Sequence, residues 1–288
     1  MRSTLALAAA LIVAATIAAA TASADPVNGS DANGTYLALG DSVAFGYVPS
    51  AAVPAPDYLD AHSFVGYPEF LAQQLNERVS NASCPGETTA SMLVAGAQSN
   101  GCENSLGSST GYSTLYPLHV QYQGTQMQYA LHYLATHTHT KLITIDIGAN
   151  DAFLCQETTA DHCTSPGELG GVFAEIATNL ATIYRELRVD AGYTGTIVAL
   201  SYYSLSYSAP AQIAGAQFLN AAIASVSAPF GVVVADGFGA FAGPSLAHDG
   251  DPCLAGLLIR LPDGTCNIHP SAAGHRLLAA AIAQAIGA

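Results

Sequence analysis

The chain has 288 residues, of which 50% are apolar and 10% are charged, and its 21 acidic and 7 basic side chains give a formal charge of −14. A chain this apolar and this poor in charge is not typical of a disordered protein. The acidic balance argues against nucleic-acid binding and against electrostatic docking on anionic lipid, because both depend on Lys and Arg.

The first 24 residues have the features of a secretory signal peptide. Arg2 is followed by an apolar, alanine-rich run, and Ala22-Ser23-Ala24 forms an A-x-A cleavage site. An uncleaved membrane anchor is the alternative, but the run is short for a span, and no later stretch reaches about 18 uninterrupted apolar residues. We therefore expect cleavage after residue 24, a single secreted domain over residues 25–288, and no membrane span in the mature chain.

The rest of the chain alternates short apolar runs with segments of helical periodicity. In chain order, the pattern predicts a strand over 36–39, a helix over 67–75, a strand over 142–147, a helix over 169–187, a strand over 197–200, a helix over 218–226, a strand over 232–234 and a helix over 272–286. Unbroken apolar runs are typical of strands that are buried on both faces of a parallel sheet. Their alternation with helices predicts an α/β fold with helices on both faces of that sheet.

Residues 98–123 differ from this pattern, since they are rich in Ser, Gly, Asn and Tyr and show little periodicity. A long irregular segment in a compact domain is often a lid or a binding loop. A solvated surface loop held by Cys102 explains the composition equally well. The segment also contains a G-x-S-x-G match at 107–111, but no strand precedes it, as the nucleophile elbow of an α/β-hydrolase requires.

The cysteines form three couples that are close in sequence. Secretion places them in an oxidising compartment, where disulfides are the expected state. Pairing by proximity is one choice among many, and a zinc site is the alternative, although the chain has no C-x-x-C motif. The predicted disulfides are Cys84–Cys102, Cys155–Cys163 and Cys253–Cys266.

Three residues with catalytic potential follow or precede the predicted elements. Ser42 follows the first strand, Asn150 follows the strand at 142–147, and His269 precedes the last helix. Ligands of an open parallel sheet bind beyond the carboxyl ends of its strands. A serine nucleophile, a histidine base and amide donors for an oxyanion together perform acyl transfer. Each of these signals is weak alone, because a serine at a strand end is usually a turn or a helix cap.

The combination and its order are more specific. Four segments resemble the four sequence blocks of the SGNH (GDSL-type) hydrolases, namely Gly40-Asp41-Ser42, Gly86 within 83–88, Gly148-Ala149-Asn150-Asp151 and Ile268-His269-Pro270. The resemblance covers nearly all of the chain after the leader and is closest to the secreted bacterial branch with three disulfides. It implies a three-layer α/β/α sandwich with a flavodoxin-like, mostly parallel five-stranded sheet. It also implies ester hydrolysis without a metal ion or another cofactor.

The same resemblance implies roles for individual residues. Ser42 would be the nucleophile and His269 the general base. The oxyanion hole would be formed by the backbone N–H groups of Ser42 and Gly86 and the side-chain amide of Asn150. Asn suits this place because it offers a neutral donor where a charged residue would be costly to bury. We expect Asp41 and Asp151, which neighbour the site, to be structural acceptors.

One position departs from the family pattern. The family usually has an Asp three residues before the histidine, whereas this chain has Cys266 there. A cysteine in a disulfide cannot orient the imidazole. Asp263 is near in sequence and is one candidate for the supporting acid, and a backbone carbonyl around 266–267 is the other. We expect a Ser–His dyad with carbonyl support.

These observations favour a secreted serine esterase or lipase that acts on a small-molecule, lipid or sugar ester. A carbohydrate or peptidoglycan O-deacetylase with the same chemistry is the second hypothesis. A non-catalytic binding module is the third, although it would have no need of Ser42, Gly86, Asn150 and His269 together. The sequence does not define the acyl length, the alcohol or the oligomeric state.

Overall fold

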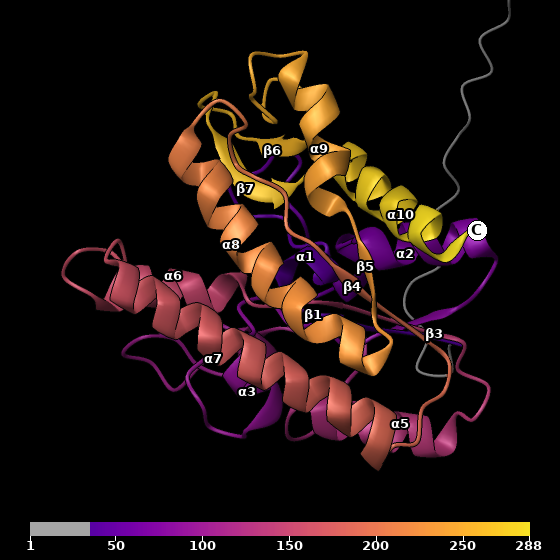
Figure 1. The fold of residues 1–288 in the computed structure, drawn as a ribbon. Helices are drawn as coiled ribbons and strands as arrows, with labels where there is room; N and C mark the ends of the chain where they lie inside the picture. Colours follow the sequence, from indigo (N-terminus) through magenta and orange to yellow (C-terminus); the bar gives the residue numbers. More distant parts are fainter. Residues whose placement is uncertain (1–34) are drawn as a thin grey trace, which may run out of the picture.

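The central element of the fold is a five-stranded sheet, all of whose strands are parallel (Figure 1). The computed structural model describes residues 35–288, so the predicted signal peptide lies outside the described residues. The strands are β1 (Tyr36–Gly40), β2 (Val79–Asn81), β3 (Leu142–Asp146), β4 (Thr196–Leu200) and β5 (Val233–Ala235). Their spatial order is β2-β1-β3-β4-β5, the flavodoxin-like order, which confirms the expected α/β fold class.

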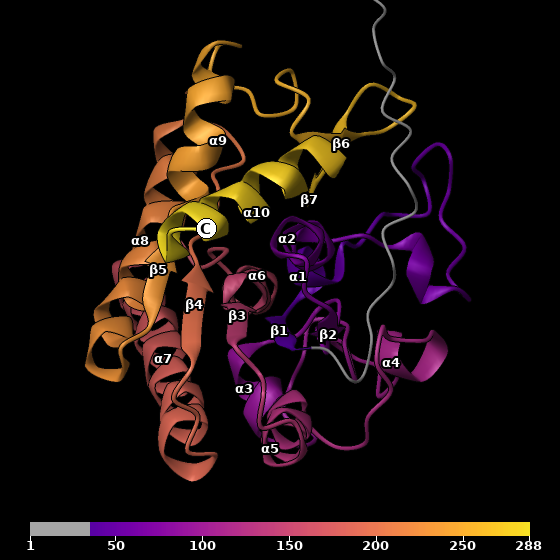
Figure 2. The same ribbon diagram turned by 90° about the vertical axis from the view of Figure 1, so that its right-hand side faces the viewer.

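Helices cover both faces of this sheet. They are α1 (Ser42–Phe45), α2 (Tyr67–Leu75), α3 (Thr89–Leu93), α4 (Tyr112–Leu115), α5 (Gln126–Thr136), α6 (Ala149–Thr158), α7 (Pro166–Arg185), α8 (Pro210–Ser227), α9 (Gly237–Leu246) and α10 (Ala272–Ile286). Helices α2 and α10 pack against each other in one layer, and α7 and α8 in the other (Figures 1 and 2). The architecture is therefore a three-layer sandwich, as expected.

The central strands form the core because both of their faces are covered. Every residue of β1 and β3 is buried, whereas Val233 and Val234 on the edge strand β5 are each 37% exposed. Strand β2 has no apolar run, because two of its three residues are the polar Ser80 and Asn81. The hydrophobic pattern therefore did not predict β2, and only the family resemblance implied a fifth strand.

Two helices show how local sequence sets their limits. Helix α10 has the predicted bounds, with Ser271 as its N-cap and Gly287 in the left-handed conformation after its end. Helix α8 begins eight residues before the predicted 218, at Pro210, a residue that suits the first turn of a helix. The periodicity did not predict its first two turns because their apolar spacing is irregular. This part of the helix lines the cavity beside Ser42.

Helix α8 is also the most apolar long helix of the described residues. The segment Pro210–Phe230 has a mean hydropathy of 1.3 and is long enough to cross a membrane by length and composition alone. In this fold it contacts α7 and β5. The absence of a membrane span in the mature chain stays a prediction.

The three predicted disulfides are present, and the described residues contain no free cysteine. Cys84–Cys102 ties the irregular segment at 98–123 to the turn that contains Gly86. Cys253–Cys266 ties the antiparallel hairpin of β6 (Leu258–Arg260) and β7 (Cys266–Pro270) to the preceding loop. All six sulfur atoms are in disulfides, which favours the predicted pairing over the alternative zinc site.

Candidate active site

Ser42 and Asn150 lie side by side because they follow neighbouring strands. Ser42 follows β1 and Asn150 follows β3, and the strand order reverses direction between these two strands. Such a switch point forms a crevice at the carboxyl ends of a parallel sheet. The turn after β1 requires a glycine, since Gly40 has a φ of +144° and a Cβ there would lie 2.4 Å from the carbonyl oxygen of Asp146.

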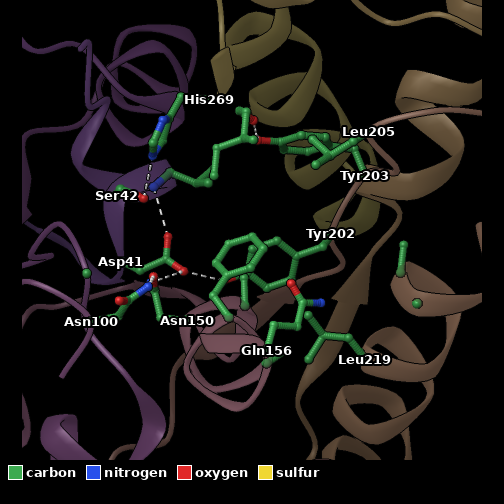
Figure 3. A pocket seen from close by; sticks show the side chains of 18 of the residues that line it. Asp41, Ser42, Asn100, Asn150, Gln156, Tyr202, Tyr203, Leu205, Leu219 and His269 are labelled. Carbon is green, nitrogen blue, oxygen red and sulfur yellow. Dashed lines mark hydrogen bonds between the residues drawn. The ribbon is translucent and has the colours of Figure 1, made fainter. Parts of the chain in front are cut away.

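His269 reaches Ser42 from the other end of the chain. It lies on β7, which contacts α1 (Figure 2). Its Nε2 is 2.8 Å from Ser42 Oγ (Figure 3). The Tyr203 hydroxyl donates to the carbonyl of Ile268 at 2.7 Å and so fixes the adjacent backbone. The structure therefore brings the predicted nucleophile and base into hydrogen-bond contact.

The other ring nitrogen of His269 contacts Asn267. Asn267 Oδ1 accepts the backbone N–H of His269 at 3.1 Å and lies 2.5 Å from Nδ1 of the same residue. Because a backbone N–H can only donate, the atom facing His269 is the amide oxygen. Nδ1 must then carry the proton, which leaves the lone pair of Nε2 directed at Ser42. This is the tautomer that a general base requires.

The contact to Asn267 corrects two expectations. Asp263 is exposed, and its carboxylate accepts hydrogen bonds from the backbone N–H and the hydroxyl of Thr265 rather than from His269. It stabilises the turn between β6 and β7. The acceptor for the imidazole is a carbonyl, as expected, but it belongs to the Asn267 side chain and not to the backbone. Asn side chains often accept the backbone N–H two residues later in an Asx turn, so the Asn at 267 was a local signal in the sequence.

Burial determines the protonation state of His269. It lowers the pKa of His269 to about 4, because a charged imidazolium is poorly solvated inside the protein. The neutral Asn267 has no negative charge to offset this effect. His269 is therefore neutral at neutral pH and ready to accept a proton.

The three predicted oxyanion donors line one cavity. Ser42 is the first residue of α1, where helix amides have no intrahelical acceptor. Gly86 has a φ of +85°, and a Cβ there would lie 2.5 Å from the carbonyl oxygen of Asn100. Glycine is therefore required at position 86 because the 98–123 segment approaches it closely. This reason adds to the expected one, which is access of a ligand to the backbone N–H.

Asn150 is held by hydrogen bonds on both ends of its amide. Its Nδ2 donates to Asp41 Oδ2 at 3.4 Å, and its Oδ1 accepts from Asn100 Nδ2 at 3.1 Å. An amide nitrogen has two protons, so one remains for a ligand. Asn100 is a site residue that sequence reasoning missed, because its role depends on a tertiary contact.

Asp41 connects Asn150, the predicted oxyanion donor, to a second missed residue, Tyr202. The Tyr202 hydroxyl donates to Asp41 Oδ2 at 2.6 Å, and the backbone N–H of Val43 donates to Asp41 Oδ1 at 2.9 Å. Burial raises the pKa of Asp41 to about 6, although both hydrogen bonds act in the opposite direction. Asp41 lines the cavity and is a structural acceptor, as expected.

Asp151 is also a structural acceptor. Its carboxylate accepts from the backbone N–H and the hydroxyl of Thr89 and so ties α6 to the start of α3.

The cavity beside Ser42 has a volume of about 450 Å³. The 98–123 segment contributes Asn100, Gly101 and Tyr112 to its wall, so this segment belongs to the site. The other walls come from α6, α7, α8 and the segment after β4. This arrangement can perform acyl transfer, with a nucleophile, a base and amide donors around one space.

Comparison with known proteins agrees with this geometry. The model of the GDSL-like lipase/acylhydrolase family matches residues 38–277. No curated protein matches the chain. Among solved structures, the acetylxylan esterase Axe2 from Geobacillus stearothermophilus aligns with a TM-score of 0.53 at 16% identity, over 88% of this chain and 94% of that one. Est24, a carbohydrate acetylesterase from Sinorhizobium meliloti, aligns with a TM-score of 0.50 at 14% identity, over 88% and 97%. At these identities the two structures show a shared fold.

Proposed function

Since the chain belongs to the GDSL-like lipase/acylhydrolase family, we propose that it is a secreted serine esterase or lipase that hydrolyses carboxylic esters through an acyl-enzyme on Ser42. The observation that carries the proposal is the 2.8 Å contact between Ser42 Oγ and His269 Nε2. Secretion is supported by the three disulfides, which persist in oxidising compartments.

In the first half of the reaction, Ser42 Oγ attacks the carbonyl carbon of the ester, and its proton moves to His269 Nε2. The carbonyl oxygen becomes an oxyanion, which the N–H groups of Ser42, Gly86 and Asn150 stabilise. The intermediate then collapses, the bond to the alcohol oxygen breaks, and the alcohol leaves with the proton from Nε2. The acyl group remains on Ser42.

In the second half, His269 takes a proton from water, and the resulting hydroxide attacks the acyl-enzyme carbonyl. A second oxyanion forms in the same place and collapses, which releases the carboxylic acid and returns the proton to Ser42 Oγ. Asn267 keeps the imidazole in one orientation through both halves. Because Asn267 is neutral, the imidazolium is stabilised less than it would be by a carboxylate.

A carbohydrate O-deacetylase is the second candidate. It uses the same residues and differs only in the acyl group and the alcohol. The shared fold with Axe2 and Est24 is compatible with it, and the Tyr47 ring, 4.9 Å from the His269 ring, offers a surface on which a sugar could stack.

The test is hydrolysis of nitrophenyl esters by the purified protein and by the Ser42→Ala variant, with circular dichroism to show that both are folded. We expect hydrolysis by the wild type and a background rate for the variant. Equal rates for the two folded proteins would contradict the assignment of Ser42. Acetate release from acetylated xylan, with no activity on longer acyl esters, would favour the deacetylase. A wild type that hydrolyses no ester and does not react with a serine-directed phosphonate would favour the binding module.

A further inference from the structure

One wall of the cavity is a single face of helix α8. The four α8 residues that line it are Gln212, Gly215, Ala216 and Leu219. Their spacing of three, one and three residues places them on one face of a helix. Two of the four have little or no side chain, so the helix backbone borders open space there. A Cβ on Gly215 would meet no atom within 4 Å.

The opposite wall is apolar as well. Leu169, Val172 and Phe173 of α7 line it at helical spacing, and Phe153 of α6 adds another ring. The Phe173 ring stacks on Phe218 of α8 with centroids 6.1 Å apart, which joins the two helices beside the cavity. No Asp, Glu, Lys or Arg from α6, α7 or α8 lines the cavity, and residues 191–235, which include all of α8, contain no charged residue.

The end of this space near Leu219 is bordered by tight packing. A Cβ on Gly148 would lie 3.1 Å from Leu219 Cδ1 and 3.2 Å from Ile176 Cγ2. Leu219 and Ile176 therefore sit directly against the turn that leads from β3 to Asn150. Leu219 therefore bounds the space at this end, where an acyl chain would meet packed side chains.

The position of His269 decides which part of an ester enters the pocket. His269 returns its proton to the alcohol oxygen, so the alcohol must leave on the side of the imidazole. His269 and Leu219 lie at opposite ends of the group of lining residues (Figure 3). The acyl chain therefore extends away from His269, between α6, α7 and α8.

We propose that this pocket binds an unbranched aliphatic acyl chain of medium length, and that Gly215 and Ala216 determine the length it accepts. The inference rests on the proposed ester hydrolysis and adds the substrate class. A pocket of about 450 Å³ lies in the range that holds drug-sized ligands, so an acetyl group would leave most of it empty. We expect the optimum at a chain longer than acetate and shorter than palmitate.

The experiment is a series of nitrophenyl esters from acetate to palmitate with the full-length secreted protein. The specificity constant kcat/KM is expected to rise about fourfold for each added methylene until the pocket is filled, and then to fall. A wild type that prefers acetate over all longer chains would overturn the inference, while its hydrolysis of acetate would leave the proposed function intact.

Two variants test the role of α8. Gly215→Leu and Ala216→Leu each place a larger side chain in the pocket, and Leu is a good helix former at both positions. Each is expected to lower the ratio of octanoate to acetate kcat/KM at least tenfold and to move the optimum to shorter chains. The matched control is Ala221→Leu, an exposed position on the opposite face of α8, which should keep the wild-type ratio. An unchanged ratio in both pocket variants would overturn the inference.

Two further measurements separate the remaining outcomes. If the pocket held the alcohol, acetate esters of longer alcohols would show the length optimum and lose it in Gly215→Leu, and this result would contradict the proposal.

Calorimetric binding of octan-1-ol to the Ser42→Ala protein tests the pocket without catalysis. Binding that weakens at least tenfold when Gly215→Leu is added would support the pocket even if no ester were hydrolysed. No detectable binding to Ser42→Ala would contradict the pocket.

Discussion

His269 Nε2 lies 2.8 Å from Ser42 Oγ although 227 positions separate the two residues in the sequence. Ser42 is held by the end of a fully buried strand, whereas His269 is held by a small hairpin at the edge of the fold. The hairpin is fixed by the Cys253–Cys266 disulfide, by the Tyr203 hydrogen bond and by the Asx turn at Asn267. The geometry of the pair therefore depends on this hairpin as much as on the sheet.

The Asn267→Ala variant tests the acceptor for His269. We expect kcat/KM for a nitrophenyl ester to fall about tenfold to a hundredfold, because a buried Nδ1–H loses its partner, which costs about 1–3 kcal/mol. Asp263→Asn is the matched control on the same hairpin and should change kcat/KM less than twofold. A loss of about ten-thousandfold in Asp263→Asn, as for a true triad acid, would contradict the assignment of Asn267.

The low pKa of His269 predicts activity in acid. His269 serves as a base only when neutral, so the acidic limb of kcat/KM should have its midpoint near pH 4, well below the ordinary histidine value of 6.5. Asn267→Asp places a carboxylate beside Nδ1, which favours the imidazolium and raises the pKa of His269. The midpoint should therefore move to higher pH in this variant. Identical midpoints in pH profiles of the two proteins would show that Asn267 does not face the imidazole.

From the proposed oxyanion hole we predict a graded loss of kcat. Asn150→Ala removes a donor and should lower kcat about a hundredfold to a thousandfold. Tyr202 lines the cavity, and Tyr202→Phe keeps its ring but removes the hydroxyl that holds Asp41 beside Asn150, so we expect a loss of about fivefold to tenfold in kcat with little change in KM. Tyr193→Phe is the control, since the Tyr193 hydroxyl donates to the Thr196 carbonyl at the other end of β4. If Tyr202→Phe matched this control, Tyr202 would have no positioning role.

The Cys253–Cys266 disulfide should matter for activity as well as for stability. The bridge joins residues 13 positions apart, and loss of a loop of this size typically costs about 3 kcal/mol. We expect the double Ser variant to have a lower Tm and, at a temperature where it is fully folded, a kcat about tenfold lower, because the hairpin no longer fixes His269. Thermal unfolding and kinetics on the same sample measure both. Full activity in the folded variant would show that the disulfide only stabilises the fold, and it would contradict a role in positioning His269.

The sheet and its main helices could be predicted because their signals are local. The apolar runs at β1 and β3 and the helical spacing of α7 and α10 follow from burial on both faces of a strand or on one face of a helix. Ser42, Asn150 and His269 were found because they adjoin these elements. Strand β2 has no such pattern, since it is three residues long and largely polar.

The missing parts of the site depend on contacts between distant segments. Asn100 and Tyr202 are ordinary polar and aromatic residues in the sequence, and only the fold brings them to Asn150 and Asp41. The small residues Gly215 and Ala216 indicate a pocket wall only once the fold places α7 across the cavity from them. Asn267 is the exception, because an Asx turn is a local feature of the sequence.

The most direct test of the central claim is covalent labelling with a serine-directed fluorophosphonate, followed by mass spectrometry of the peptides. The wild type should gain one phosphonate, on Ser42, and lose its esterase activity in parallel. The folded Ser42→Ala protein should gain none and should hydrolyse nitrophenyl esters at the background rate. Labelling at another residue, or activity that survives in the unlabelled Ser42→Ala protein, would contradict the account.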